Sequence, residues 1–125
     1  MEKGNRKRLG KNNPKWTGCG EISGAIWADI KAGARVREIP FSIEVEEAWN
    51  LFLKQNRKCA LSGEELFIED NRTASLDRID SKEGHVLHNI QWIHKTLNIM
   101  KQSFSQQVFV EFCQKVANHC GEINE

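Results

Sequence analysis

The sequence lacks several features that would assign it to a specialised class of protein. None of its apolar runs approaches the ~18 residues that a membrane-spanning helix needs, and no secretory signal pattern is present. It also contains no internal repeat. With 125 residues, of which 39% are hydrophobic and 28% charged, the chain is expected to form one soluble globular domain with a modest core. These absences predict a cytoplasmic protein with no membrane partner.

The sequence lacks paired cysteines, which argues against a local zinc site. No two of the four cysteines form a Cys-x-x-Cys pair. Disulfides are rare in the cytoplasm, so we expect small, buried free thiols. The sequence therefore does not predict a structural zinc ion, although a site that recruits Cys113, His119 or Cys120 stays open as an alternative.

The net charge of +1 conceals a strongly basic N-terminal segment. Residues 1–15 hold six lysines and arginines against one acid and so carry +5, whereas the remaining residues sum to −4. Residues 1–18 have too few apolar side chains to fold alone, and they are predicted to form a flexible basic arm. We favour an arm that contacts DNA phosphates through residues such as Arg8 and Lys11. The alternative is a leader that only improves solubility.

Apolar periodicity predicts helices on both sides of a central β unit. Residues 21–34 and a segment from Ser42 to about Asn56 carry apolar stripes, with Ser42 as the N-cap of the second helix. Ser105 is expected to cap a last helix that ends at Gly121. All of these stripes are expected to lie in the core. The chain then divides into the arm, a helical part over 19–57, a core unit over 58–102 and a C-terminal helix over 103–125.

The core unit reads as a short hairpin followed by strand, loop, strand and helix. A Ser62-Gly63 turn separates the two arms of the hairpin, and Gly84 lies in the later loop. The expected segments are hairpin arms at 58–61 and 66–68, strands at 73–80 and 89–93, and a helix from about 94 to about 102.

The most informative stretch lies within this unit, over residues 74–101. It reads Ala-Ser-Leu-Asp-Arg-Ile-Asp at 74–80, Asn-Ile-Gln-Trp-Ile-His at 89–94 and Asn-Ile-Met-Lys at 98–101. One small ββα unit would gather Asp77, Asn89, Asn98 and Lys101. Such a unit can hold one divalent metal ion against a phosphodiester, which is the chemistry of a compact nuclease.

Residues 58–101 resemble the HNH (ββα-metal) endonuclease family, and residues 16–119 more widely resemble its phage and bacterial members with a Ser-Leu-Asp-Arg-Ile-Asp strand. The family pattern has an Asp-His pair at the end of the first strand, an Asn near the second strand, and a His or Asn nine residues later on the helix. Asp77, Asn89 and Asn98 match this pattern, and Lys101 follows three residues later. The resemblance implies an α+β fold, with a ββα-metal core between N-terminal helices and a C-terminal helix. Arg78 stands where the family has its catalytic histidine.

This constellation assigns a role to each residue. Asp77 and Asn98 are expected to bind Mg²⁺ or Mn²⁺ through a carboxylate and a carboxamide oxygen. Asn89 is expected to brace the loop between the strands, and Lys101 to face a DNA phosphate. Arg78 cannot accept a proton at pH 7, but it can clamp a phosphate.

The general base is the open question in this set. His94 is our first candidate, because it lies one helical turn before Asn98 and would share its helix face. Asp80, His85 and a water molecule that needs no protein base are the alternatives.

Three functions fit these residues. The favoured one is a metal-dependent HNH-type DNA endonuclease or nickase that hydrolyses phosphodiester bonds. The second is a DNA-binding module of HNH fold whose catalysis has lapsed because Arg78 replaces the histidine. The third, a small interaction domain organised by zinc, is disfavoured by the missing Cys-x-x-Cys pairs.

Overall fold

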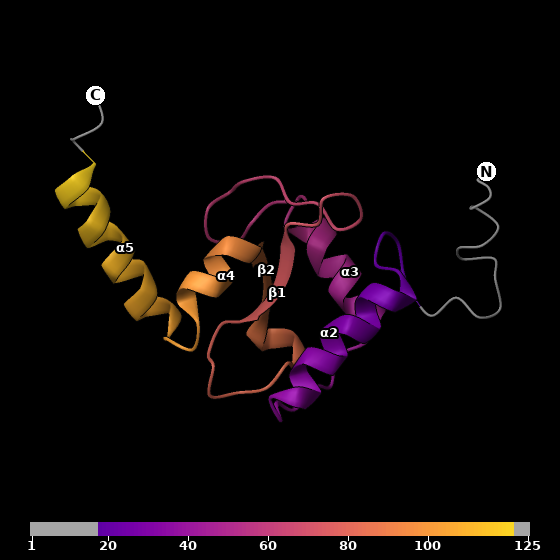
Figure 1. Ribbon diagram of the computed structural model, residues 1–125. Helices are drawn as coiled ribbons and strands as arrows, with labels where there is room; N and C mark the ends of the chain where they lie inside the picture. The colour runs from indigo at the N-terminus through magenta and orange to yellow at the C-terminus, as the bar shows by residue number, and fades with distance from the viewer. Residues whose placement is uncertain (1–17, 122–125) are drawn as a thin grey trace.

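Residues 18–121 form two helices, a two-stranded antiparallel sheet and two further helices, in that order (Figure 1). This computed structural model describes residues 18–121, so the predicted arm, with Arg8 and Lys11, lies outside the described residues except for Gly18. No helix in this range is long and apolar enough to cross a membrane. The elements are α2 (Gly24–Val36), α3 (Val45–Lys54), β1 (Ala74–Arg78), the 3-10 turn η1 (Leu87–Asn89), β2 (Ile90–His94), α4 (Lys95–Lys101) and α5 (Gln106–Cys120).

The two N-terminal helices lie close to their predicted positions but begin at different caps. Helix α2 begins after Ser23, whose Oγ accepts a hydrogen bond from Ile26 N at 3.1 Å. The prediction that Ser42 caps α3 is wrong. Glu44 occupies the N-cap position, and its backbone N–H donates to Glu47 Oε1 at 2.9 Å. A carboxylate in the first turn satisfies an otherwise free backbone donor and also suits the helix dipole.

The sheet has one apolar and one polar face. In the register of β1 and β2, Leu76 is opposite Trp92, while Asp77 is opposite Gln91. Successive side chains point to opposite faces, so the two pairs lie on different sides. The mixed α+β class predicted from the sequence is confirmed, with an antiparallel pair of strands followed directly by a helix.

The apolar face packs on α3 and forms the core. The Trp92 indole N–H donates to Ala48 O at 2.9 Å, and its ring meets Phe52 edge to face with centroids 5.7 Å apart. The side chain of Gln55 hydrogen-bonds both the N–H and the carbonyl of Trp92, each at 3.0 Å. One amide side chain thus satisfies both groups on the outer edge of β2 and fixes that strand against α3.

The predicted hairpin before β1 forms only in part. Its two arms meet through one isolated bridge, between Lys58 and Glu65, and Gly63 makes the turn with φ +79°. The segments fold back as predicted but do not extend into strands.

The polar face of the sheet is covered by α4, which lies on the other side of the strands from α3 (Figure 1). Asn98 bonds Ser75, and Lys101 bonds Asp77. Helix α5 is capped by Ser105 and followed by Gly121, as predicted. The expectation that its apolar stripe lies in the core is wrong, because α5 has no buried residue and projects away from the sheet (Figure 1).

Candidate active site

A small cavity of about 30 Å³ lies where the end of α2, β1, the loop after β1 and α4 meet. A second hollow of about 180 Å³ adjoins this cavity and also borders Ser75. Four residues line both spaces: Arg37, Leu76, His85 and Asn98. The smaller cavity has room for one water molecule or one ion. Its lining residues are Arg37, Leu76, Asp77, Arg78, Ser81, His85, Asn98 and Gln102.

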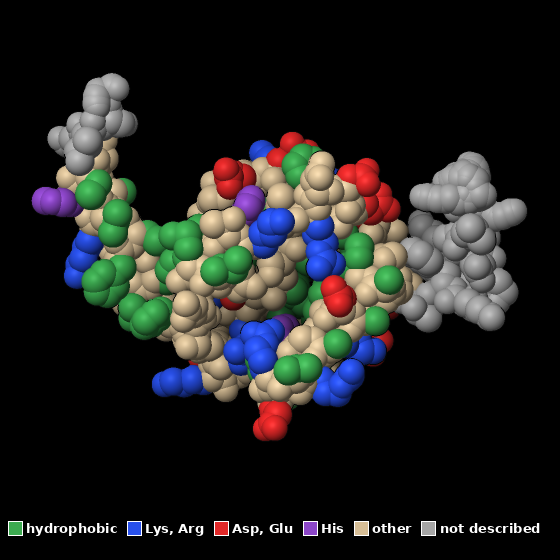
Figure 2. Space-filling model, viewed as in Figure 1, with side chains coloured by type: hydrophobic (Ala, Val, Ile, Leu, Met, Phe, Trp, Pro, Cys, Tyr) green, Lys and Arg blue, Asp and Glu red, His purple; other side chains and the backbone are tan. Residues whose placement is uncertain are grey.

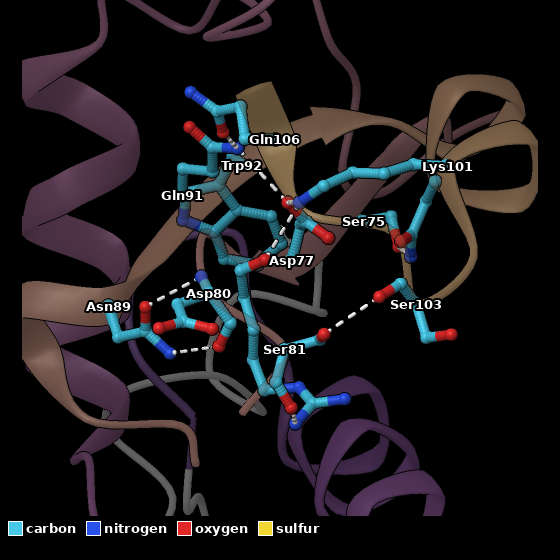
Figure 3. Close-up of polar contacts among 12 residues, drawn as sticks. Ser75, Asp77, Asp80, Ser81, Asn89, Gln91, Trp92, Lys101, Ser103 and Gln106 are labelled. Atoms are coloured by element: carbon cyan, nitrogen blue, oxygen red, sulfur yellow. Dashed lines mark hydrogen bonds and ion pairs between the residues drawn. The ribbon is translucent and has the colours of Figure 1, made fainter. Parts of the chain in front are cut away.

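Asp77 is held at this cavity by a buried ion pair with Lys101. The two side chains are 5% and 1% exposed, and Lys101 Nζ lies 2.6 Å from Asp77 Oδ2 (Figure 3). Lys101 Nζ also donates to Arg78 O at 2.8 Å. Lys101 was predicted to face a DNA phosphate. The structure instead places its ammonium group inside the protein, where it neutralises Asp77 and ties α4 to the end of β1.

Two glutamines extend this network toward α5. Gln91 Nε2 donates to Asp77 Oδ2 at 3.0 Å and lies 2.7 Å from Gln106 Oε1 in the first turn of α5 (Figure 3). Asp77 Oδ2 therefore has two donors, whereas Oδ1 has no hydrogen-bond partner among the described residues. Sequence reasoning missed Gln91, and its only signal was its place opposite Asp77 in the paired strands.

Asn98 presents a second free oxygen. Its Nδ2 donates to Ser75 Oγ at 2.6 Å, which fixes the carboxamide plane and leaves Oδ1 without a partner in the part of the chain that the structure describes. Ser75 and Asp77 are two residues apart in β1, so their side chains point to the same face of the sheet. Because Asn98 bonds Ser75, it lies on the same side of the sheet as Asp77. Both residues line the cavity, as the sequence predicted for a pair of ligands.

Asn89 acts on the loop and does not line either hollow. Its Oδ1 accepts from Asp80 N at 2.9 Å, and its Nδ2 donates to Asp80 O and Gly84 O, both at 3.0 Å. The side chain is 3% exposed. These three bonds brace the loop between β1 and β2, and that loop carries His85.

His85 is the histidine that the fold brings to the cavity. It is 3% exposed and stacks at a tilt on Phe41, with ring centroids 5.0 Å apart. Its backbone pairs with Pro40 and Ser42, and Gly84 beside it lies so close to Pro40 O that an added Cβ would come within 2.6 Å. His85 Nδ1 is the one fully buried side-chain polar atom in residues 18–121 that has no hydrogen-bond partner.

Two arginines flank this imidazole and control its charge. Burial first, and then the positive charges of Arg78 and Arg37, lower the pKa of His85 to about 4, against a smaller opposing effect of Asp77. The imidazole is therefore neutral at pH 7. Burial also lowers the pKa of Arg78, and the charge of Arg37 adds to that effect, but the Arg78 guanidinium stays charged at pH 7.

Arg78 and Arg37 reach the cavity from different elements. Arg78 Nη1 donates to Ser81 O at 2.6 Å and to Glu83 O at 3.0 Å, so part of its guanidinium is used to hold the loop. Arg37 follows the last turn of α2, where its Nε donates to Gly33 O at 3.2 Å. Arg37 was not predicted from the sequence, because it lies 40 residues before Asp77 and only the packing of α2 brings it there. Figure 2 shows lysine and arginine side chains near the middle of this face of the molecule.

The other candidate bases lie elsewhere. His94 ends β2, and its Nδ1 accepts from Thr96 N at 3.1 Å as the N-cap of α4. Because His94 precedes the helix, its side chain does not continue the face of Asn98, and it lines neither hollow. Asp80 is exposed, and its Oδ1 accepts from Lys82 N at 2.9 Å.

Comparison with protein-family models, curated proteins and solved structures finds no match to the chain. The geometry of the cavity is therefore the basis for assigning a function.

The donors at the cavity can be compared with what a metal ion requires. Within residues 18–121, no three His, Cys, Asp or Glu side chains lie together as a ready set of ligands. The cavity does offer the unpartnered oxygens of Asp77 and Asn98, and a neutral imidazole beside them. Two protein oxygens suit a hard cation such as Mg²⁺ or Mn²⁺, which takes its remaining ligands from water and substrate phosphate.

Proposed function

We propose that this protein is a divalent-metal-dependent endonuclease or nickase of HNH type that hydrolyses phosphodiester bonds in DNA. The observation that carries the proposal is that Asp77 and Asn98 line one cavity of ion size whose walls are cationic. Each of them has a side-chain oxygen, Oδ1, with no hydrogen-bond partner among residues 18–121. The order of β1, β2 and α4 is that of a ββα unit and supports the same assignment.

Asp77 and Asn98 would hold Mg²⁺ or Mn²⁺ through these oxygens. Such an ion supplies Lewis acidity toward the scissile phosphate and stabilises the charge on the leaving oxygen. The carboxylate of Asp77 is already neutralised by Lys101, and Arg37 and Arg78 add positive charge at the cavity. We therefore expect the free protein to bind a cation weakly, and to bind it more tightly once a DNA phosphate is present.

Arg37 and Arg78 are suited to receive that phosphate. A guanidinium can bind two phosphate oxygens at once, and a partly buried one does so with less competition from water. Arg78 is fixed by its bonds to the loop, whereas Arg37 is exposed. Arg78 would therefore orient the phosphate, and Arg37 would help attract it.

His85 is the residue that we assign as general base. Arg78 cannot take a proton at pH 7, but the imidazole of His85 is neutral and lies at the same cavity. Asn89 keeps the loop that carries His85 in place through its three hydrogen bonds. In this assignment His85 accepts a proton from the attacking water, and His94 has no catalytic role.

The test is cleavage of supercoiled plasmid by the full chain with Mg²⁺, with Mn²⁺ and with EDTA. We expect nicked or linear DNA with either metal and none with EDTA. Asn98→Ala should abolish cleavage, and Asn98→Asp should retain part of it. Asn50→Ala, at an exposed position of α3, should behave like the parent. Equal rates for Asn98→Ala and the parent at saturating metal would show that Asn98 is not a ligand.

The base assignment has its own matched pair in one loop. His85→Ala should slow cleavage by about 10²–10⁴-fold, which is the usual scale for loss of a general base. His88→Ala is the control, because His88 is exposed and contacts Glu83, 3.0 Å away. His94→Ala should leave the cleavage rate nearly unchanged. A loss of rate as large as the one expected for His85→Ala would contradict the assignment of His85 as the base.

A DNA-binding module with lapsed catalysis is the second candidate. The cationic walls and the neutralised Asp77 favour it, since they attract a phosphate even without a metal. Tight DNA binding that is unaffected by EDTA, with no cleavage under Mg²⁺ or Mn²⁺, would identify this function instead.

A further inference from the structure

The apolar face of α5, together with Met100 of α4 and Phe104 between the two helices, forms an open groove of about 580 Å³. Figure 2 shows it as a band of hydrophobic side chains that runs from the body of the molecule along the projecting helix. We name this surface the α5 groove. It is lined by Met100, Phe104, Val108, Phe109, Phe112, Cys113, Val116 and Ala117.

The α5 groove is much more exposed than apolar side chains usually are. Phe104 is 60% exposed, Phe112 59% and Val116 61%. The opposite side of the helix carries polar residues at helical spacing, among them Gln107, Gln114 and Asn118. A helix of 15 residues is marginally stable in water without contacts to its apolar face. An amphipathic helix of this kind is stabilised when another apolar surface covers it.

The segments next to the described range are poorly suited to be that cover. Residues 122–125 read Glu-Ile-Asn-Glu, with one apolar side chain. Residues 1–17 carry six lysines and arginines, and their large apolar side chains are Met1, Leu9 and Trp16. Neither stretch has the number of apolar groups that the groove exposes.

We propose that the α5 groove is an interface between two copies of this chain, in which each α5 lies in the groove of the other copy. The residues that line the groove are uncharged, so two identical grooves can meet without like charges at their centre. The neighbouring cation is Lys115, whose Nζ lies 4.8 Å from the Phe112 ring centroid. The interaction is reciprocal, because each copy supplies both a groove and a helix to fill it. This inference does not depend on the proposed function.

The exposed area is sufficient for such an interface. A phenylalanine presents roughly 150–250 Å² of surface, so Phe104 and Phe112 at their observed exposures contribute roughly 200 Å². Met100, Val108 and Val116, at 55%, 38% and 61% exposed, raise the apolar area to roughly 500 Å² per copy. Two copies would bury on the order of 1,000 Å², which is near the lower limit for a specific interface.

The experiment is a mass measurement of the full chain in solution by sedimentation equilibrium over a range of concentrations. We expect a reversible dimer. Phe112→Glu should weaken dimerisation at least about a hundredfold, because it removes an apolar ring from the interface and places a carboxylate there that must lose its water. Gln114→Glu adds the same charge on the polar side of α5 and should leave the dimer unchanged.

A second variant and a second measurement separate loss of the interface from loss of the helix. Phe104→Glu lies before α5 begins, so it tests the groove without altering the helix sequence. Alkylation mapped by mass spectrometry should show Cys113 protected at high protein concentration, while Cys120, which is exposed and outside the groove, reacts at all concentrations. A parent chain that is monomeric at high concentration, or a dimer that Phe104→Glu and Phe112→Glu leave intact, would overturn the proposal.

Discussion

Replacement of Lys101 by methionine would remove half of the buried ion pair on which the site is built. Lys101 Nζ lies 2.6 Å from Asp77 Oδ2 and 2.8 Å from Arg78 O, and the side chain is 1% exposed. Methionine keeps most of the apolar stem but removes the positive charge and its three N–H donors. Asp77 would then stay buried with Gln91 as its one remaining protein donor.

The expected loss of stability is large. Removal of one partner from a buried ion pair typically costs about 3–5 kcal/mol. Asp77 borders the cavity, where water can solvate part of the charge, so we expect the lower end, about 3 kcal/mol. Domains of this size are stable by ~5–15 kcal/mol in total. The midpoint of thermal unfolding should therefore fall by roughly 10 °C or more.

Urea unfolding followed by tryptophan fluorescence measures this loss. Lys95→Met is the matched control, because Lys95 is exposed in the first turn of the same helix and should change stability by less than about 0.5 kcal/mol. Asp77→Asn combined with Lys101→Met should recover much of the loss, since no unpaired charge is then buried. If Lys101→Met unfolds at the same urea concentration as Lys95→Met, the argument from a buried ion pair is refuted.

Three further predictions concern charged groups of the chain. In metal-free buffer, the free energy of unfolding should fall by up to about 3 kcal/mol as the pH is lowered from about 6.5 to about 4. In this interval His85 is protonated in the unfolded chain but stays neutral in the folded one, so acid favours the unfolded state. Urea midpoints of His85→Gln should show a smaller dependence over that interval. Arg37→Gln should lower the slope of log DNA affinity against log salt by about 0.9, whereas Lys115→Gln on α5 should not. Deletion of residues 1–15 should lower that slope by a few units at most, and an unchanged slope would show that the arm is only a leader.

The Lys101 result also decides how variants of Asp77 are interpreted. Asp77→Ala removes a candidate ligand, but it also leaves the Lys101 ammonium buried without its partner. An inactive Asp77→Ala could therefore be an unstable protein. Asn98 is half-buried and bonds only Ser75 through its side chain, so its substitution reports on the cavity with less effect on folding.

The local part of the fold was predictable from the sequence because its signals are close together in the chain. Alternating residues around Asp77, the polar loop and the spacing to Asn98 all lie within 28 residues. They correctly indicated an antiparallel pair of strands followed by a helix, and they brought Asp77 and Asn98 to one cavity. A strand pair with a short connection has few other ways to arrange these side chains.

The features that the sequence did not indicate depend on distant packing or on a small shift in boundary. Arg37 reaches the cavity only because α2 packs beside the loop that carries His85. His94 was predicted within a helix that includes Asn98, but it ends β2, so its ring caps α4 instead. In the sequence, a lysine at position 101 is equally compatible with an exposed helix end and with a buried ion pair. Only the contact with Asp77 in the folded protein explains why Lys101 is buried. An apolar stripe such as that of α5 does not reveal whether its cover is its own core or another molecule.

The roles proposed for Arg78 and His85 depend on each other. Where the HNH pattern has a histidine, Arg78 offers no proton acceptor at pH 7. Its positive charge adds to the effect of burial, which is the main reason that the pKa of His85 is lowered and its imidazole is neutral. A phosphodiester that binds between Arg37 and Arg78 would offset the charges that now lower the pKa of His85. Its basicity would then rise when the substrate arrives, and the empty cavity would hold it in the form that can accept a proton. On this argument, an arginine at the end of β1, where the HNH pattern has a histidine, does not by itself count against the catalysis that we propose.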